Sequence, residues 1–194
     1  KCPGHNANGV VEDVSLTTVK VRNFDNTVTT VPPYSLVSES FQNYQAMVNS
    51  AGRRVSRAFY LDANTVRFCS GEEVASLQAE GFIEDADLEG EDRPVNLKLF
   101  RLYMERYLRN DQRVNSDLTL MIRQLDPTPS GLPIELYFFT RTTQWVEFEH
   151  TQSDIFNHLY ATIGRFGLKV FQSPAGSDLL GMAAASSSPQ VLNS

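Results

Sequence analysis

Two histidines and an aspartate form the constellation in this sequence that most resembles a reactive site. His150, Asp154 and His158 follow one another at intervals of four residues, and side chains four apart on a helix can share a metal ion. Eight residues nevertheless drift by about 80° around a helix with 3.6 residues per turn. Ile155 and Leu159 also occupy the apolar face of the same stretch. We therefore interpret it as a solvated helix face and predict no metal; an enzyme using His150 and His158 is the alternative.

The two cysteines and a pair of aromatic residues are further candidates. Cys2 and Cys69 cannot make a disulfide framework, and neither belongs to a CxxC motif or a Cys/His ligand cluster. This usage is typical of a reducing compartment, and Cys69 is interpreted as a buried structural residue because no suitably spaced His or Asn would activate it. Trp145 and Phe148 are interpreted as packing residues rather than as a stacking platform for a ligand.

Arg53, Arg54 and Arg57 form the only basic cluster. They could bind an anion, a lipid headgroup or acidic residues of an assembly, but a solvated junction between two domains is the preferred interpretation. The sequence contains no P-loop, no GxGxxG, no GxSxG and no HExxH motif. We predict that the protein is not an enzyme and that it uses no cofactor.

Composition and charge narrow the possible classes. The 194 residues, 41% hydrophobic and 21% charged, are enough for at most two ordinary cores. The net charge of −6 has the wrong sign for a protein that neutralises a phosphate backbone, so nucleic acid is not expected as a partner. Residues 71–96 alone contain one basic and nine acidic side chains, and the run EDADLEGEDRP at 84–94 is interpreted as a solvated loop or insertion.

The chain has no membrane-spanning signal. No stretch approaches the ~18 consecutive apolar residues of a spanning helix. The sequence begins with Lys1 and shows no signal peptide, so we expect a soluble fragment excised from something longer.

The first part of the chain reads as a small β domain. Residues 9–31 contain three runs rich in β-branched residues. Asp25 and Asn26 tolerate left-handed backbone and predict a tight turn between antiparallel strands. Pro32 and Pro33 end the third run because proline cannot donate to a β ladder.

The remainder alternates strands and helices, which favours an α+β fold. Ser70 and Glu73 have the spacing of a capping box, and Gly81 stands where the helix should end. Strands are expected at 55–61, 65–69, 117–125, 133–141 and 168–172, and helices at 71–80, 97–109 and through 155–163. The Ala/Ser/Gly-rich residues 173–194 are expected to form a flexible tail.

The segment from Gly9 to Leu36 resembles the β domain of the small-conductance mechanosensitive ion channel family. The pattern consists of a glycine before the first strand, a valine repeat, a Thr and an Arg in the second strand, an acidic-polar turn, and an apolar strand ending in proline. Those places correspond to Gly9, Val11, Val14, Thr18, Arg22, Asp25-Asn26, Val28, Val31 and Pro32. The Pro32-Pro33-Tyr34 sequence, the FQNYQ segment and an insertion near 82–115 resemble the miniconductance branch, and a weaker resemblance continues to about Gln172.

The resemblance implies an Sm-like β domain over 1–50, a ferredoxin-like α/β domain over 51–172 and a tail over 173–194. It also implies a vestibule on the cytoplasmic face of the bacterial inner membrane, in a channel that opens under tension to release ions and solutes in hypo-osmotic stress. The expected partners are permeating ions, other copies of the chain in a heptamer, and the membrane, through helices missing from this chain.

Open sheets of short strands bury their edges by pairing subunits in a ring. The expected interface layer comprises Gly9, Val11, Val14, Thr18, Val21, Arg22, Val28, Val31 and Pro32. Acidic residues near a side portal would attract cations within about one Debye length, ~8 Å; these are Glu84, Asp85, Asp87, Glu89, Glu91 and Asp92. An Sm-like RNA-binding ring fits the strand pattern equally well and is the main alternative, although the charge and the long α+β extension argue against it.

Overall fold

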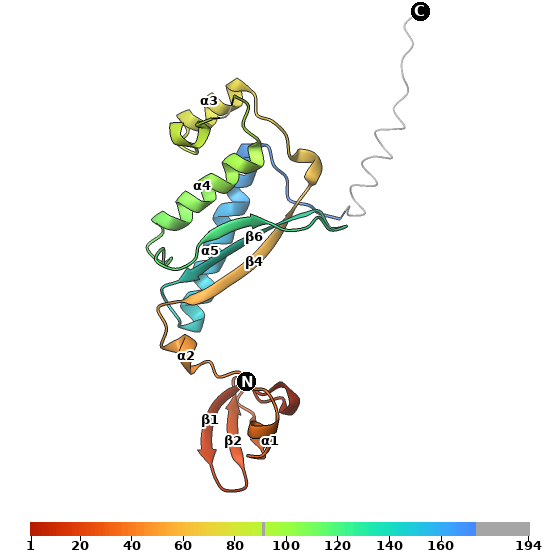
Figure 1. The fold of residues 1–194 in the computed structure, drawn as a ribbon, viewed down its shortest axis with the longest axis vertical. Helices are drawn as coiled ribbons and strands as arrows, with labels where there is room; N and C mark the ends of the chain where they lie inside the picture. The colour runs from red at the N-terminus through yellow and green to blue at the C-terminus, as the bar shows by residue number, and fades with distance from the viewer. Residues whose placement is uncertain (91, 174–194) are drawn as a thin grey trace, which may run out of the picture. The chain divides into compact units, whose positions relative to one another are not determined.

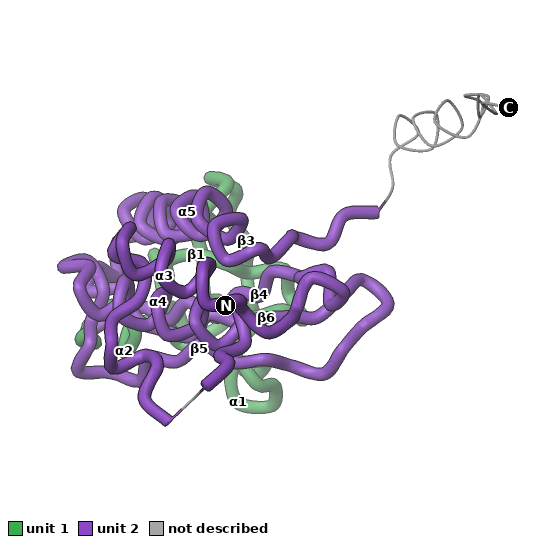
Figure 2. Tube along the Cα trace, turned by 90° about the horizontal axis from the view of Figure 1, so that it is seen from above, with its two compact units in different colours: residues 1–51 green, residues 52–194 purple. Residues whose placement is uncertain are grey.

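A computed structural model describes residues 1–90 and 92–173 (Figure 1). The chain divides into two compact units, Lys1–Ala51 and Gly52–Ser194, which Figure 2 distinguishes by colour. Apart from Ser173, the expected flexible tail lies outside the described residues, as does Glu91.

The first unit is built on a three-stranded antiparallel sheet in the order β1-β2-β3. Strand β1 spans Gly9–Val14, β2 spans Val19–Asn23 and β3 spans Val28–Val31. The predicted strands and turn are confirmed. Asn26 has a φ of 67°, and the Asp25 carboxylate accepts a hydrogen bond from the Thr27 backbone at 3.0 Å, which closes the hairpin.

Short helical segments precede and follow this sheet in the chain. A 3₁₀ turn covers Pro3–His5, and helices α1 and α2 cover Ser35–Ser38 and Gln45–Val48. The buried apolar cluster of the unit is small and joins the N-terminal turn to the sheet; its members are Cys2, Ala7, Val19, Val21 and Val31. Such a cluster buries little apolar surface, so each of its members matters for stability.

The second unit contains a sheet in the order β4-β6-β5. Strand β4 spans Arg53–Leu61, β5 spans Met121–Gln124 and β6 spans Leu132–Thr140, all paired antiparallel. The strand predicted at 65–69 is wrong, because a 3₁₀ turn covers Ala63–Thr65 and only Phe68 forms an isolated bridge, to Val95. The strand predicted at 168–172 is likewise reduced to one bridge, between Leu61 and Val170.

The described residues of this unit also form the α-helices α3 at Gly71–Ala79, α4 at Asn96–Asn110 and α5 at Trp145–Thr162 (Figure 1). The predicted capping box is present, since the Ser70 hydroxyl and the Glu73 carboxylate each accept a backbone hydrogen bond from the other residue. Gly81 has a φ of 77°, as its place after the helix predicts.

The large core lies between the sheet and helices α4 and α5. Alternate residues of β6 from Leu132 to Thr140 face it, because successive side chains of a strand point to opposite faces. Helix α4 falls within the insertion expected near 82–115, yet it is a core element of this unit. Its residues Leu99, Phe100, Met104 and Leu108 have no exposed surface.

Candidate functional site

The edge of the first sheet presents an apolar surface. Val11 pairs with Val21 and Val14 with Val19 across β1 and β2, so all four side chains share one face of the sheet. Val19 and Val21 are covered by the core of the unit, whereas Val11 is 53% and Val14 69% exposed. Leu16 follows, almost fully exposed. We call Val11, Val14 and Leu16 the β1 apolar edge.

The remaining members of the expected interface layer divide into two groups. Val21 and Val31 are buried within the first unit itself, so any contact with another copy falls to the exposed residues. Arg22 is bound to Glu12 at 2.5 Å, Val28 is half exposed, and Thr18 and Pro32 lie at the ends of strands.

Gly9 allows β1 to lie against β2. A Cβ atom at this position would lie 1.9 Å from the Arg22 carbonyl oxygen and 2.6 Å from the Asn23 Cα. Both are backbone atoms of the neighbouring strand and cannot rotate away. The glycine that begins the family pattern is therefore required by the close approach of two strands.

The acidic segment is more ordered than a solvated loop. Residues Asp85–Leu88 form a 3₁₀ turn, and Arg106 of α4 reaches it. The guanidinium lies 2.8 Å from the Asp87 carboxylate and 3.2 Å from that of Glu84, and it donates to the Phe82 carbonyl at 2.7 Å. Arg106 thus partly offsets the charge of this segment. Asp85, Glu89 and Asp92 are exposed, and Glu91 lies outside the described residues.

The structure does not bring His150, Asp154 and His158 together. Asp154 is ion-paired with Arg113 at 2.6 Å. His158 stacks on Tyr107 with ring centroids 3.9 Å apart, and burial lowers its pKa. His150 is exposed and lines a shallow, open depression with Arg113 and Arg141. Each of the three residues therefore contacts a different neighbour or solvent, as expected for a helix face.

Further candidates from the sequence are Cys69, Phe148 and Trp145. Cys69 is buried, and burial raises the pKa of its thiol, which disfavours the nucleophilic thiolate. Phe148 is buried, whereas Trp145 is exposed.

The arginine cluster begins just after the boundary between the two units at Ala51 and Gly52, and Arg54 and Arg57 are exposed, in agreement with the interpretation of a solvated junction. Its three guanidinium groups lie over aromatic rings within the second unit. Arg53 lies 4.1 Å from the ring centre of Phe148, Arg57 lies 4.4 Å from Phe156, and Arg54 lies 5.8 Å from Tyr137.

One cluster was missed by the sequence analysis, which placed Cys2 outside any Cys/His ligand cluster. The ligand atoms of Cys2, His5 and Glu39 lie within 4.8 Å of one another. The Cys-x-x-His spacing could have drawn attention to the first two residues. Glu39 is separated from them by the whole sheet in sequence, so spacing gives no sign of it.

No helix among residues 1–90 and 92–173 is long and apolar enough to cross a membrane. Residues 4–46 match the sequence model of the mechanosensitive ion channel β-domain. The fold matches the cryo-EM structure of Arabidopsis thaliana MSL1 with a TM-score of 0.60 and 14% identity, covering 87% of this chain and 50% of that one. It matches the closed-state crystal structure of Helicobacter pylori MscS with a TM-score of 0.56 and 12% identity, covering 86% and 52%.

The chain therefore spans about half the length of these solved structures. Its fold is α+β, with a β domain followed by an α/β domain, as predicted. The match of residues 4–46 to the mechanosensitive ion channel β-domain agrees with the sequence resemblance to the small-conductance mechanosensitive channel family, and the chain shares the fold of the two solved channel structures. That family consists of ion channels rather than enzymes.

Proposed function

We propose that this chain forms the cytoplasmic vestibule of a mechanosensitive channel of the miniconductance branch. The channel opens under membrane tension and releases ions and solutes in hypo-osmotic stress, in the inner membrane of a bacterium. Membrane helices precede Lys1 in the complete protein. The exposed β1 apolar edge carries this proposal, because it lies in the segment that matches the family's β domain.

The vestibule is a homo-oligomer, and seven copies form its wall. Strands β1 and β3 are the two edges of the first sheet, and unpaired edges with apolar neighbours favour pairing with another chain. The β1 apolar edge continues the face that Val19 and Val21 bury inside the unit. A neighbouring copy that covers Val11 and Val14 would extend that small core across the subunit boundary.

The acidic segment lies beside a side portal in this proposal. Asp85, Glu89 and Asp92 supply exposed charge there, whereas Arg106 partly neutralises Glu84 and Asp87. Cation enrichment therefore depends mainly on the first three residues and on Glu91. Replacing these four residues by their amides in the complete channel should reduce its preference for cations over anions. An unchanged reversal potential would contradict a portal role.

Patch-clamp recording of the complete protein in liposomes tests the channel function directly. Suction on the patch should open discrete conductances, and a strain lacking mechanosensitive channels should survive hypo-osmotic shock when it expresses the protein. Absence of apolar segments upstream of Lys1 in the complete protein, or silence under lytic tension, would refute the proposal.

Assembly is tested by replacing Val14 with Asp, which places a charge on the β1 apolar edge. We expect fewer heptamers in native mass spectra of the complete protein in detergent. Val37→Asp is the matched control, because Val37 is an exposed valine outside the sheet, on α1. Equal assembly of both variants would exclude this edge as the subunit contact.

A further inference from the structure

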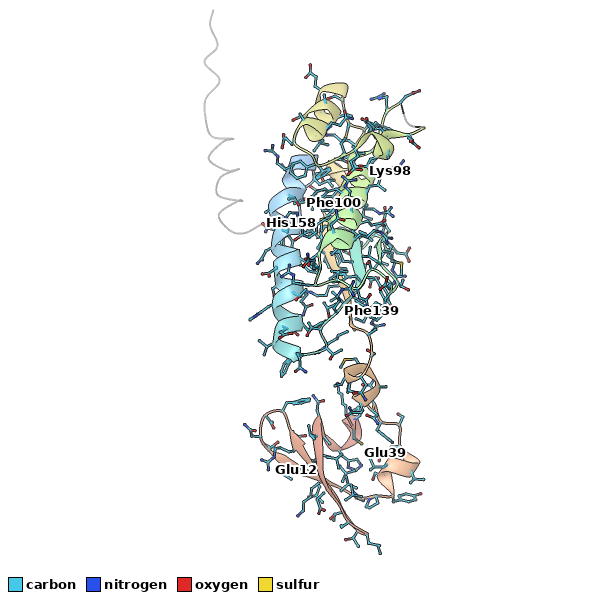
Figure 3. The ribbon with its side chains drawn as sticks, turned by 90° about the vertical axis from the view of Figure 1, so that its left-hand side faces the viewer. Glu12, Glu39, Lys98, Phe100, Phe139 and His158 are labelled. Carbon is cyan, nitrogen blue, oxygen red and sulfur yellow. The ribbon has the colours of Figure 1, made fainter. Side chains whose placement is uncertain are left out.

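The first unit brings together a thiol, an imidazole and a carboxylate from two separate segments. Cys2 precedes the 3₁₀ turn at Pro3–His5, His5 is the last residue of that turn, and Glu39 follows helix α1 (Figure 3 labels Glu39). One ligand atom from each side chain lies within 4.8 Å of the other two. Thiolate sulfur, imidazole nitrogen and carboxylate oxygen are the ligands that Zn²⁺ uses in proteins.

Backbone hydrogen bonds fix the turn that carries two of these groups. The Cys2 amide donates to the Ala7 carbonyl at 2.7 Å, and the amides of His5 and Ala7 donate back to the Cys2 carbonyl at 3.2 and 3.1 Å. Asn6 closes the turn in the left-handed region, with a φ of 51°. Cys2 and His5 are therefore held on one side of a short closed loop, an arrangement that preorganises two ligands.

Glu39 is brought to this turn by contacts on both sides of it. Its amide donates to the Ser35 carbonyl at 2.9 Å, and Gln42, three residues later, pairs with Lys1. Gly4 leaves space for the carboxylate, because a Cβ at that position would lie 2.6 Å from the Glu39 Oε2. The carboxylate thus lies directly over the turn.

One of the three distances between ligand atoms matches that of a tetrahedral zinc site, and all three are within 4.8 Å. Bonds of about 2.3 Å to sulfur and about 2.1 Å to nitrogen or oxygen place neighbouring ligand atoms about 3.3 to 3.6 Å apart. His5 Nε2 and Glu39 Oε1 are already 3.3 Å apart. The Nε2 atom is also buried and has no hydrogen-bond partner within the described chain, so a lone pair there is available to a metal.

We propose that Cys2, His5 and Glu39 form a Zn²⁺ site with three protein ligands and a fourth position open to solvent. Cys2 is buried, whereas the side chains of His5 and Glu39 are 26% and 44% exposed, which gives the ion a path of entry. The ion would link the residues before β1 to the residues after β3. Because the ion binds the folded first unit and not the unfolded chain, it would raise the stability of that unit. This proposal does not depend on the proposed channel function.

Zinc affinity is measured on the 194-residue chain without a histidine tag, after chelation and dialysis, by competition with a chromophoric chelator. We expect one tight site per chain and a higher Tm in the presence of Zn²⁺. Co²⁺ should give a thiolate-to-metal charge-transfer band in the wild-type protein. Absence of tight Zn²⁺ binding would overturn the proposal and leave Cys2 as a core residue beside a surface ion pair.

Variants locate the site. Cys2→Ser, His5→Gln and Glu39→Gln should each weaken Zn²⁺ binding by at least about 100-fold, because even residues that only orient metal ligands are worth 10- to 100-fold. The matched controls change the same residue types elsewhere: Cys69→Ala, His150→Gln and Glu72→Gln should bind Zn²⁺ as the wild type does. This ligand set would be refuted if a control variant lost as much Zn²⁺ affinity as the ligand variant of the same residue type. Unchanged Zn²⁺ binding by Cys2→Ser would refute it as well.

Two further measurements do not require removal of a ligand. Gly4→Ala adds only a methyl group against the Glu39 carboxylate, so it should weaken Zn²⁺ binding while the metal-free Tm changes little. In the wild-type protein, Zn²⁺ should protect Cys2 from alkylation and leave the rate at Cys69 unchanged, as mapped by peptide mass spectrometry. Alkylation of Cys2 at the same rate with and without Zn²⁺ would contradict coordination by its sulfur.

Discussion

His158 of α5 lies flat against Tyr107 of α4, with ring centroids 3.9 Å apart and an angle of 5° between the rings. Its Nε2 also lies 2.6 Å from the hydroxyl oxygen of Tyr103. Burial of the imidazole disfavours its charged form and lowers the pKa of His158. His158 thus joins the two helices that cover the sheet of the second unit (Figure 3 labels His158).

This arrangement predicts how stability depends on pH. Because the pKa of His158 is lower in the folded state than in the unfolded chain, the unfolded state binds more protons as the pH falls below about 6.5. The free energy of unfolding of the wild-type protein should therefore decrease from about pH 7 to pH 5. The free energy of unfolding of His158→Gln should decrease less steeply over the same range. Urea unfolding at several pH values measures both slopes.

His150→Gln is the control for that experiment, because His150 is an exposed histidine on the same helix. It should retain the wild-type slope. If His158→Gln has the wild-type slope as well, the stacked imidazole does not contribute to the pH dependence.

The capping box of α3 predicts a second effect on stability. The Ser70 hydroxyl accepts a hydrogen bond from the Glu73 amide at 3.3 Å, while the Glu73 carboxylate accepts from the Ser70 amide at 2.8 Å. Ser70→Ala should lower the free energy of unfolding by about 1 kcal/mol. Ser153→Ala, an exposed serine inside α5, should have little effect because it caps no helix. Equal midpoints of urea unfolding for the two variants would contradict a role of the cap.

The Glu73 carboxylate also makes the stability of the protein depend on pH. Hydrogen bonds from Arg67 and from the Ser70 amide lower the pKa of Glu73 to about 2. Since this value is below that of the unfolded chain, the resulting stability is present above the unfolded pKa and is lost as the pH falls towards 2. Glu73→Gln should lack this part of the acid sensitivity. Both partners are more than one-third exposed, so the effect should be modest.

Gly9 tests the packing of β1 against β2. An alanine at this position would place its methyl group 1.9 Å from the Arg22 carbonyl oxygen, and the strands would have to separate. Gly9→Ala should therefore lower the free energy of unfolding of the first unit by about 1–3 kcal/mol. Amide hydrogen exchange of β1 and β2 measures the effect, with Gly71→Ala as control because no atom lies within 4 Å of a Cβ there. Unchanged protection of both strands in Gly9→Ala would show that they do not need this close approach.

Local patterns were sufficient to predict the elements whose determinants lie within a few residues. The hairpin turn depends on Asp25, Asn26 and their neighbour Thr27, and the start of α3 depends on Ser70 and Glu73. The apolar repeat of 97–109 predicted α4 for the same reason, because one helix face supplies its buried residues.

Elements that depend on distant residues could not be predicted in this way. The strand expected at 65–69 does not form, because the buried Asn96 side chain binds the Thr65 carbonyl, the Arg67 amide and the Phe166 carbonyl instead. The aromatic partners of Arg53 and Arg57 come from α5, about 95 residues later in the chain, and Glu39 approaches Cys2 only through the folded sheet. The spacing of residues along the sequence does not indicate such contacts.

Arg106 provides a final prediction, because acceptors on Phe82, Glu84 and Asp87 converge on it. Its side chain is 25% exposed and that of Asp87 is only 10% exposed. Removal of the guanidinium therefore leaves the mostly buried Asp87 carboxylate with the Glu84 amide as its donor and without its counter-charge, and it removes the donor to the Phe82 carbonyl. Arg106→Met should lower the free energy of unfolding by about 1–3 kcal/mol and speed amide exchange at residues 84–90. Arg109→Met, at an exposed arginine of the same helix, should cost no more than about 0.5 kcal/mol. Exchange at 84–90 that is equally slow in both variants would mean that the segment is held by its own turn rather than by Arg106.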